Sequence, residues 1–202
     1  AGGSGNIAGF TAAVNTSGTA VTGTINVTAS KNGCTGPVMS FTITIKPEPV
    51  VAAVANQAYC PGAAINIPLT SNVGGSVQTW TNSNAAIGIA VSGTGDIIYT
   101  APANNTGADI VGTVVVTGNS NGCSSTGLNQ KTFTITIHPS PVVSAQSNVS
   151  VCSGGAVGAI TFTANTGGGE TYNWTNSNPS IGLSAGGSGN IAGFTAAVNT
   201  SG

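Results

Sequence analysis

Cysteines are the residues of this chain best suited to form covalent bonds or to bind a metal, and their positions favour disulfides. Cys60 and Cys123 are 63 positions apart in a chain of 202 residues that has four cysteines. Closing a loop of that length contributes about 4 kcal/mol in the chain-entropy model, a useful gain for a small domain. No Cys-x-x-Cys pair or nearby histidine completes a tetrahedral zinc set, so we expect no metal site. A Cys60–Cys123 disulfide, with free buried thiols as the alternative, predicts an extracellular protein.

The other titratable side chains are too isolated to suggest catalysis. His138 is the only histidine, and a solvent-exposed side chain is its simplest interpretation. Glu48 and Glu170 have no acidic neighbour in sequence with which to form a catalytic pair. Asp96 and Asp109 are single carboxylates, whereas calcium sites need several converging oxygens, so only a site built on turn carbonyls stays open. We therefore expect neither an enzyme nor a bound cofactor.

Four aromatic residues lie where a sandwich fold would bury its core. Trp80 and Trp174 begin two copies of Trp-Thr-Asn-Ser-Asn, and Phe41 and Phe133 lie in two copies of Phe-Thr-Ile-Thr-Ile. An exposed tryptophan is able to stack on a sugar ring, but a buried tryptophan is typical of such sandwiches. We predict that all four side chains belong to the core.

The sequence of the first residues returns at the end of the chain. Residues 1–18 recur letter for letter as residues 185–202, which gives a repeat period of 184 residues. Units copied in series usually build length and not a catalytic pocket. The repeat also accounts for the two remaining cysteines, because Cys152 and Cys34 are expected to find their disulfide partners in adjacent repeats.

A weaker repeat divides this period into two halves. Cys60 and Cys152 are 92 positions apart, so each half has the size of one immunoglobulin-like domain. We predict a complete domain at 50–141. Residues 1–49 would be the C-terminal part of a second domain type, and residues 142–202 its N-terminal part.

Alternation of apolar residues with threonine and other polar residues predicts an all-β fold. The clearest strands of the complete domain are 65–69, 110–117 and 132–137. A sheet with one apolar face must pack against a second such sheet, which gives a β-sandwich. Asn-Gly pairs at 32–33 and 121–122 predict tight turns between strands.

Proline-rich segments connect the predicted domains. Pro47-Glu48-Pro49 and Pro139-Ser140-Pro141 each follow a predicted last strand and run almost directly into the next apolar stretch. Proline restricts the backbone to extended geometry, so we expect short linkers that hold neighbouring domains end to end.

Composition excludes several classes of partner. The chain has 3 basic and 4 acidic residues, too few to bind a nucleic acid backbone. Its apolar runs are far shorter than the roughly 20 residues that span a bilayer, so membrane insertion is not expected. Asn-x-Ser/Thr triplets, including those at Asn26 and Asn104, arise by chance in such a composition and leave glycosylation open.

The combined pattern resembles a known repeat family. Its parts are Trp-Thr-Asn-Ser-Asn-x-x-Ile-Gly, then Ser-Gly-x-Gly, Gly-Cys and a closing Phe-Thr-Ile-Thr-Ile-x-Pro-x-Pro. This string resembles the PKD-like immunoglobulin-fold repeats of very long secreted bacterial surface proteins, including adhesins of gliding bacteria. The resemblance implies a structural fibre at the cell surface or released from it, with surface glycans or other cells as candidate partners. It supplies no catalytic residue.

Two forms of such a fibre and one different function stay open. The chain could belong to a single-chain stalk, or to a filament in which copies of the repeat pack against one another. Surfaces of uncharged threonine, serine and asparagine lack the self-repulsion that keeps proteins apart, which slightly favours the filament. The alternative is a carbohydrate-binding or scaffolding module of a secreted enzyme, which would need a row of exposed aromatic side chains.

Overall fold

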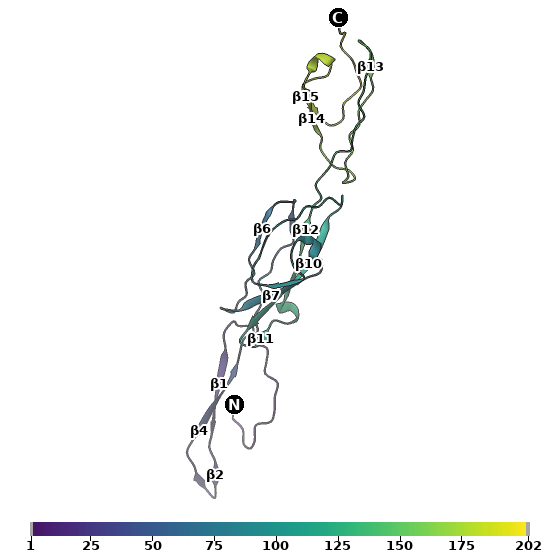
Figure 1. Ribbon diagram of the computed structural model, residues 1–202. Coiled ribbons are helices and arrows are strands. Elements are labelled where there is room, and N and C mark those ends of the chain that lie inside the picture. The colour runs from purple at the N-terminus through teal and green to yellow at the C-terminus, as the bar shows by residue number, and fades with distance from the viewer. Residues whose placement is uncertain (1, 201–202) are drawn as a thin grey trace. The chain divides into compact units, whose positions relative to one another are not determined.

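The computed structural model describes residues 2–200, and its regular structure is almost entirely β-strand (Figure 1). The helical elements in this part of the chain are three single-turn 3-10 helices. Contacts divide the chain into two compact units. The first comprises the chain up to Tyr59 with Ala63–Ala101 and Val111–Thr136, and the second comprises Cys60–Gly62, Pro102–Ile110 and the chain from Ile137 onward. The predicted all-β class is confirmed.

The strands up to β12 include every long strand that the structure describes. The N-terminal strands are β1 (Val21–Val27), β2 (Ser30–Lys31), β3 (Cys34–Thr35) and β4 (Met39–Ile45). The following elements are β5 (Gln57–Tyr59), β6 (Ala64–Ile67), β7 (Val77–Asn82), η1 (Ala85–Ile87), β8 (Ser92–Thr94), β9 (Ile97–Thr100), β10 (Ile110–Ser120), β11 (Cys123–Ser124), η2 (Gly127–Asn129) and β12 (Lys131–Ile137). We call the region from β5 to β12 the complete sandwich.

Two sheets make up the complete sandwich. The larger has strand order β5-β12-β10-β7-β8, with β11 added to β10, and the smaller pairs β6 with β9. Alternate residues face the core, as in β10, where Val114 and Val116 are 0% exposed. The buried hydrophobic residues are Val51, Ile65, Ile67, Leu69, Val73, Trp80, Ile87, Ile97, Ala101, Val114, Val116, Phe133, Ile135 and Ile137. This arrangement is consistent with a β-sandwich.

The two Asn-Gly pairs form the tight turns that the sequence predicts. Asn32 and Gly33 have φ of 51° and 81° between β2 and β3, and Asn121 and Gly122 have φ of 51° and 82° between β10 and β11. Positive φ at both central residues is the geometry of a type I′ hairpin turn, which asparagine and glycine adopt at low cost.

The N-terminal segment is a hairpin whose apolar face is only partly covered. β1 pairs antiparallel with β4, with Val21 opposite Ile45 and Ile25 opposite Phe41. None of the described residues from 2 to 46 is buried. Phe41, which we predicted to be a core residue, is 39% exposed. This prediction is wrong for the chain as it stands, because the face of β4 that carries Phe41 is only partly covered, with Ile43 and Ile45 half-buried.

The second unit has only short strands after Ile137. They are β13 (Ala156–Val157), β14 (Asn173–Thr175), β15 (Gly186–Ser188) and β16 (Phe194–Thr195), with the 3-10 helix η3 (Pro179–Ile181). β13 pairs with β16 and β14 with β15 (Figure 1, green to yellow). No described residue from 141 to 200 is buried, and Trp174, a predicted core residue, is only half-buried. The predicted core is therefore incomplete in this segment.

The predicted Cys60–Cys123 disulfide is not present, and the direction of β5 explains why. All four cysteines, Cys34, Cys60, Cys123 and Cys152, are unbonded. The Val51 amide donates to the Asn129 carbonyl at 2.9 Å, and the Thr134 amide donates to Asn56 Oδ1 at 2.9 Å. The segment that leads into β5 therefore runs in the same direction as β12.

This parallel course separates the two cysteine positions. Cys60 directly follows β5. Because β5 runs in the same direction as β12, Cys60 lies at the end of the sheet where β12 ends. Cys123 begins β11 beside the start of β12, where Gln130 Nε2 donates to Thr117 Oγ1 at 2.8 Å. β12 has seven residues and spans about 23 Å, whereas bonded cysteines have Cα atoms about 6 Å apart. The predicted partners of Cys34 and Cys152 lie outside this chain, and their pairing stays a prediction.

Candidate functional site at the proline-rich junctions and the open sheet faces

The titratable residues are scattered over the part of the chain that the structure describes. No group of three or more histidine, cysteine, aspartate or glutamate side chains converges among residues 2–200. His138 Nδ1 lies 2.8 Å from Asp109 Oδ1, and both side chains are 47% exposed. An exposed pair of this kind contributes little to stability.

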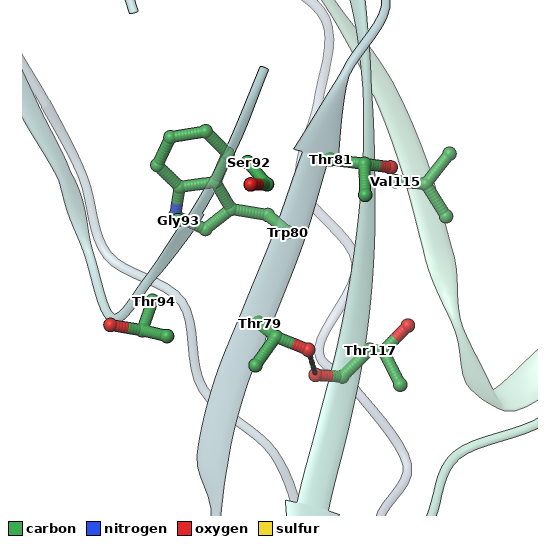
Figure 2. Close-up of a pocket in the computed structure, with 8 residues that line it drawn as sticks. All are labelled: Thr79, Trp80, Thr81, Ser92, Gly93, Thr94, Val115 and Thr117. Carbon is green, nitrogen blue, oxygen red and sulfur yellow. Dashed lines mark hydrogen bonds between the residues drawn. The ribbon is translucent and has the colours of Figure 1, made fainter. Parts of the chain in front are cut away.

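A shallow hollow of about 320 Å³ lies beside Trp80 (Figure 2). Its lining residues are Thr79, Trp80, Thr81, Ser92, Gly93, Thr94, Val115 and Thr117. Figure 2 shows the Trp80 indole extending over the strand that carries Gly93, and the residue is only 9% exposed. Because the ring is packed against its neighbour strand, it does not present a free face on which a sugar could stack. Trp80 is a core residue, as predicted.

The first junction, residues 45–50, is organised by Asn15. Asn15 Nδ2 donates to the carbonyl oxygens of Thr19 at 2.7 Å and of Ile45 at 3.1 Å. Asn15 Oδ1 accepts from the amide and the hydroxyl of Ser17. The Asn15 carbonyl accepts from the Glu48 amide at 2.8 Å, so one residue ties a loop to both the end of β4 and the proline-rich segment.

Asn72 fixes the other side of this junction. Its Oδ1 accepts from the Val50 amide at 2.7 Å, and its own amide donates to the Val50 carbonyl at 3.1 Å. Its Nδ2 donates to the Thr16 carbonyl at 2.8 Å, which links the complete sandwich to the loop before β1. Gly18 packs closely against this group, because a Cβ added there would lie 2.6 Å from the Asn72 carbonyl oxygen.

Glu48 adds a charged contact to the first junction. Its Oε1 accepts from the Thr126 amide at 2.6 Å, the Thr126 hydroxyl at 2.9 Å and Asn129 Nδ2 at 3.0 Å. Hydrogen bonds from Asn129 and then from Thr126 hold the pKa of Glu48 below its ordinary value of 4.5. The ionised carboxylate is therefore the form that the junction stabilises.

Acid is expected to loosen this contact. Because the pKa of Glu48 is lowered in the folded state, its contribution to stability is complete above the ordinary pKa of 4.5 and is lost as pH falls through the lowered pKa. The Thr126 amide proton signal, followed by NMR through the acid range, should move with a midpoint below 4.5. Glu48→Gln should remove that titration. A midpoint at or above 4.5 would contradict this assignment.

The second junction, residues 137–142, repeats the first with Asn104 in place of Asn15. Asn104 Nδ2 donates to the Ala108 and Ile137 carbonyl oxygens, both at 2.8 Å. Its Oδ1 accepts from the amide and hydroxyl of Thr106, and its carbonyl accepts from the Ser140 amide at 3.0 Å. Asn104 is 1% exposed and engages its side chain fully, so this triplet is a structural motif and offers no free amide to a glycan.

Asn165 takes the place of Asn72 at the second junction. Its Oδ1 accepts from the Val142 amide at 2.8 Å, and its amide donates to the Val142 carbonyl at 3.2 Å. Gly107 approaches it as Gly18 approaches Asn72, with an added Cβ only 2.5 Å from the Asn165 carbonyl oxygen. Both junctions therefore use an asparagine on each side and a glycine between them.

Sequence reasoning missed the role of these asparagines at the junctions, although the sequence contained a signal for it. Asn15-Thr16-Ser17-Gly18 and Asn104-Asn105-Thr106-Gly107 share the pattern Asn-x-Ser/Thr-Gly, and each precedes a long strand. The glycine of this pattern is needed because the backbone passes close to the Asn72 or Asn165 carbonyl oxygen, and not only because the loop is flexible.

The hairpin β1–β4 and residues 142–200 expose side chains that the complete sandwich buries. Aligning the Asn-Gly turns and the Phe-Thr-Ile-Thr-Ile strings makes Val27 equivalent to Val116 and Phe41 equivalent to Phe133. Val27 is 41% and Phe41 39% exposed, whereas Val116 and Phe133 are 0% and 1% exposed. The difference lies in the neighbours of each strand, since the residue types are the same.

The duplicated ends give an internal control for this effect. In residues 185–202, Gly186–Ser188 pairs with β14 and Phe194–Thr195 pairs with β13. The identical residues 2–4 and 10–11 form no strand, and Phe10 is 64% exposed. One sequence thus has two local structures within a single chain, according to whether partner strands are available.

Comparison with known proteins adds no further constraint. No protein-family model matches the chain, and no curated protein matches it. Within residues 2–200, no helix is long and apolar enough to cross a membrane.

Proposed function

We propose that this chain is a structural repeat of an extracellular filament or of a surface adhesin stalk, and that it carries out no catalysis. The observation that carries the proposal is the pair of matched junctions. Asn15 and Asn104 bond in the same way to the last strand residue before each junction, and Asn72 and Asn165 bond in the same way to the valine after it, at two places separated by about one predicted domain. A connection that is built twice in the same way is suited to serial assembly.

The kind of domain and its location belong to the same proposal. Sandwiches of the PKD-like immunoglobulin type, joined by the two Pro-x-Pro segments, account for the 92-residue spacing of the shared motifs. Only 3% of the residues are charged, which suits a molecule that packs against copies of itself. The absence of a Cys60–Cys123 bond removes one argument for an extracellular location, which now rests on the repeat pattern and the resemblance.

Rigid junctions are the property that a fibre requires, and Gly18→Val tests them. Gly18 has φ of +83° and an added Cβ would lie 2.6 Å from the Asn72 carbonyl oxygen, so valine should force the junction apart. We expect small-angle X-ray scattering of this variant to show a broader distribution of interatomic distances than that of the wild type. Melting of the complete sandwich should change little.

Gly9→Val is the matched control, because Gly9 has no positive φ and nothing within 4 Å of an added Cβ. It should scatter as the wild type does. Identical scattering from Gly18→Val and the wild type would argue against junctions that are held rigid by this contact. For chains with more repeats in tandem, negative-stain images should show thin filaments with an axial spacing of about 40 Å per domain.

A further inference from the structure

We propose that the open face of residues 142–200 is closed by the hairpin β1–β4 of a second copy of this chain. This inference rests on the proposed function, in which copies of the chain associate. The occupant is inferred from the complete sandwich, where the equivalents of both partners are already packed together. Strands β10 and β12 correspond to β1 and β4, and β7 corresponds to β14.

The complete sandwich predicts the register of the new strand pair. β10 pairs antiparallel with β7, with Val114 opposite Asn82 and Val116 opposite Trp80. The same pairing would set Ile25 of the second copy opposite Asn176 and Val27 of the second copy opposite Trp174. β14 pairs only with β15 within the described residues, so its other edge is open to receive β1.

A groove lined by both apolar and polar side chains lies where the incoming hairpin would pack. It has a volume of about 880 Å³. Its apolar lining residues include Val149, Val151, Val157, Ile160, Ile181, Leu183, Phe194 and Val198. Ile181 shows what is missing, since it is 45% exposed whereas its equivalent, Ile87, is 0% exposed. Phe41, Ile43 and Ile45 form the complementary apolar row on β4.

Gly23 of the hairpin also fits this arrangement. Nothing lies within 4 Å of a Cβ added at Gly23 in this chain, so its own surroundings give no reason for a glycine in the middle of β1. At the equivalent Gly112, an added Cβ would lie 2.7 Å from both Ile87 Cδ1 and Asn82 Oδ1. A glycine at position 23 therefore leaves room for Ile181 and its neighbours in a second copy.

The segment just before Cys152 also lacks, within the described residues, the neighbouring strand that its equivalent in the complete sandwich has. Gln57–Tyr59 forms β5 beside β12, and Asn56 Oδ1 accepts from the Thr134 amide. The equivalent residues, 149–151, form no strand, and Val149 and Val151 are 58% and 43% exposed. β4 of a second copy would supply the missing neighbour, with the Thr42 amide facing Asn148.

Such an interface is heterologous, because the hairpin of one copy meets a different surface of the next. When copies of these 202 residues associate in this way, each assembly has one unfilled groove and one unused hairpin at its ends, so association continues head to tail into an open filament unless it closes into a ring. Residues 1–14 of the incoming copy are not required, because residues 185–198 of the receiving copy hold the same sequence and already pair with β13 and β14.

Two variants that each block one surface test the proposal. Phe41→Asp places a charge on the apolar row of the hairpin, and Ile181→Asp places one in the groove. By sedimentation velocity, the wild type should form species whose mass rises with concentration. Each variant alone should stay at the 19.4 kDa of one chain. An equal mixture should form a dimer of twice that mass, because one intact groove and one intact hairpin are then available.

A control and a second measurement keep the result unambiguous. Thr35→Asp puts the same charge on an exposed residue of β3, outside the strand pairs of the proposed interface, and should assemble as the wild type does. Melting of the complete sandwich, reported by Trp80, should be the same in all variants, which shows that they are folded. Formation of the mixed dimer should shift tryptophan emission to shorter wavelength as Trp174 becomes buried.

Absence of a dimer in the mixture, or assembly of Phe41→Asp by itself, would overturn the proposal. Loss of assembly in Thr35→Asp to the same extent as in Phe41→Asp would also overturn it. These outcomes are independent of the scattering experiment on Gly18→Val, which uses one chain. A rigid junction without a mixed dimer would refute this interface and leave the proposed function standing.

Discussion

Trp80→Ala is expected to lower the free energy of unfolding of the complete sandwich by about 3–5 kcal/mol. Trp80 is 9% exposed and lies on β7, which is flanked by β10 and β8 in the larger sheet. Its loss removes a large apolar surface and leaves a cavity that the surrounding strands are unable to fill by small shifts. Chemical denaturation followed by circular dichroism gives the measurement.

Trp174→Ala supplies a matched control within the same chain. Trp174 lies over Gly187 as Trp80 lies over Gly93, with an added Cβ 2.4 Å from the ring, but it is only half-buried. The unfolding transition of the complete sandwich should be unchanged in this variant. If Trp80→Ala instead abolished binding to glycans while leaving stability intact, the carbohydrate-binding alternative would be correct.

Gly93→Val is expected to destabilise the complete sandwich by about 1–3 kcal/mol, although valine favours strands more than glycine does. A Cβ at Gly93 would lie 2.2 Å from Cζ2 of Trp80, far inside van der Waals contact. Gly93 has no positive φ, so backbone strain does not contribute. The free energy of unfolding in denaturant therefore reports the collision with the indole ring.

A double-mutant cycle separates this collision from other effects. In the Trp80→Ala background the ring is gone, so Gly93→Val should cost much less, with an interaction energy of about 0.5–3 kcal/mol between the two sites. Gly74→Val is the control, since nothing lies within 4 Å of a Cβ added there. Equal costs for Gly93→Val in both backgrounds would show that the ring is not the obstacle.

The strand pattern of the complete sandwich was predictable because its residues obey simple local rules. Alternation in 132–137 places Phe133, Ile135 and Ile137 on one buried face, and the structure buries all three. The Asn121-Gly122 turn was also predictable, because few residue pairs adopt two positive φ angles at low cost. Burial of Trp80 follows from its place on an inward-facing strand position.

Features that depend on distant neighbours were not predictable in this way. The sequence placed Cys60 and Cys123 in one domain, but only the parallel course of β5 and β12 shows that they lie toward opposite ends of the sheet. Phe41 has the same local pattern as Phe133, yet its exposure is decided by strands that its own segment lacks. The junction asparagines act through backbone groups up to 56 residues away, as with Asn72 and Thr16.

The two local structures of the duplicated 18 residues have a consequence for how a string of copies gains stability. In such a string, every added copy closes one groove and offers one new hairpin, so the number of unclosed ends stays constant while the number of closed sandwiches grows. The cost of the ends is then a fixed nucleation term, and the free energy of each further closure is a propagation term. Long strings would therefore melt at higher temperature than short ones, with fraying confined to the terminal copies.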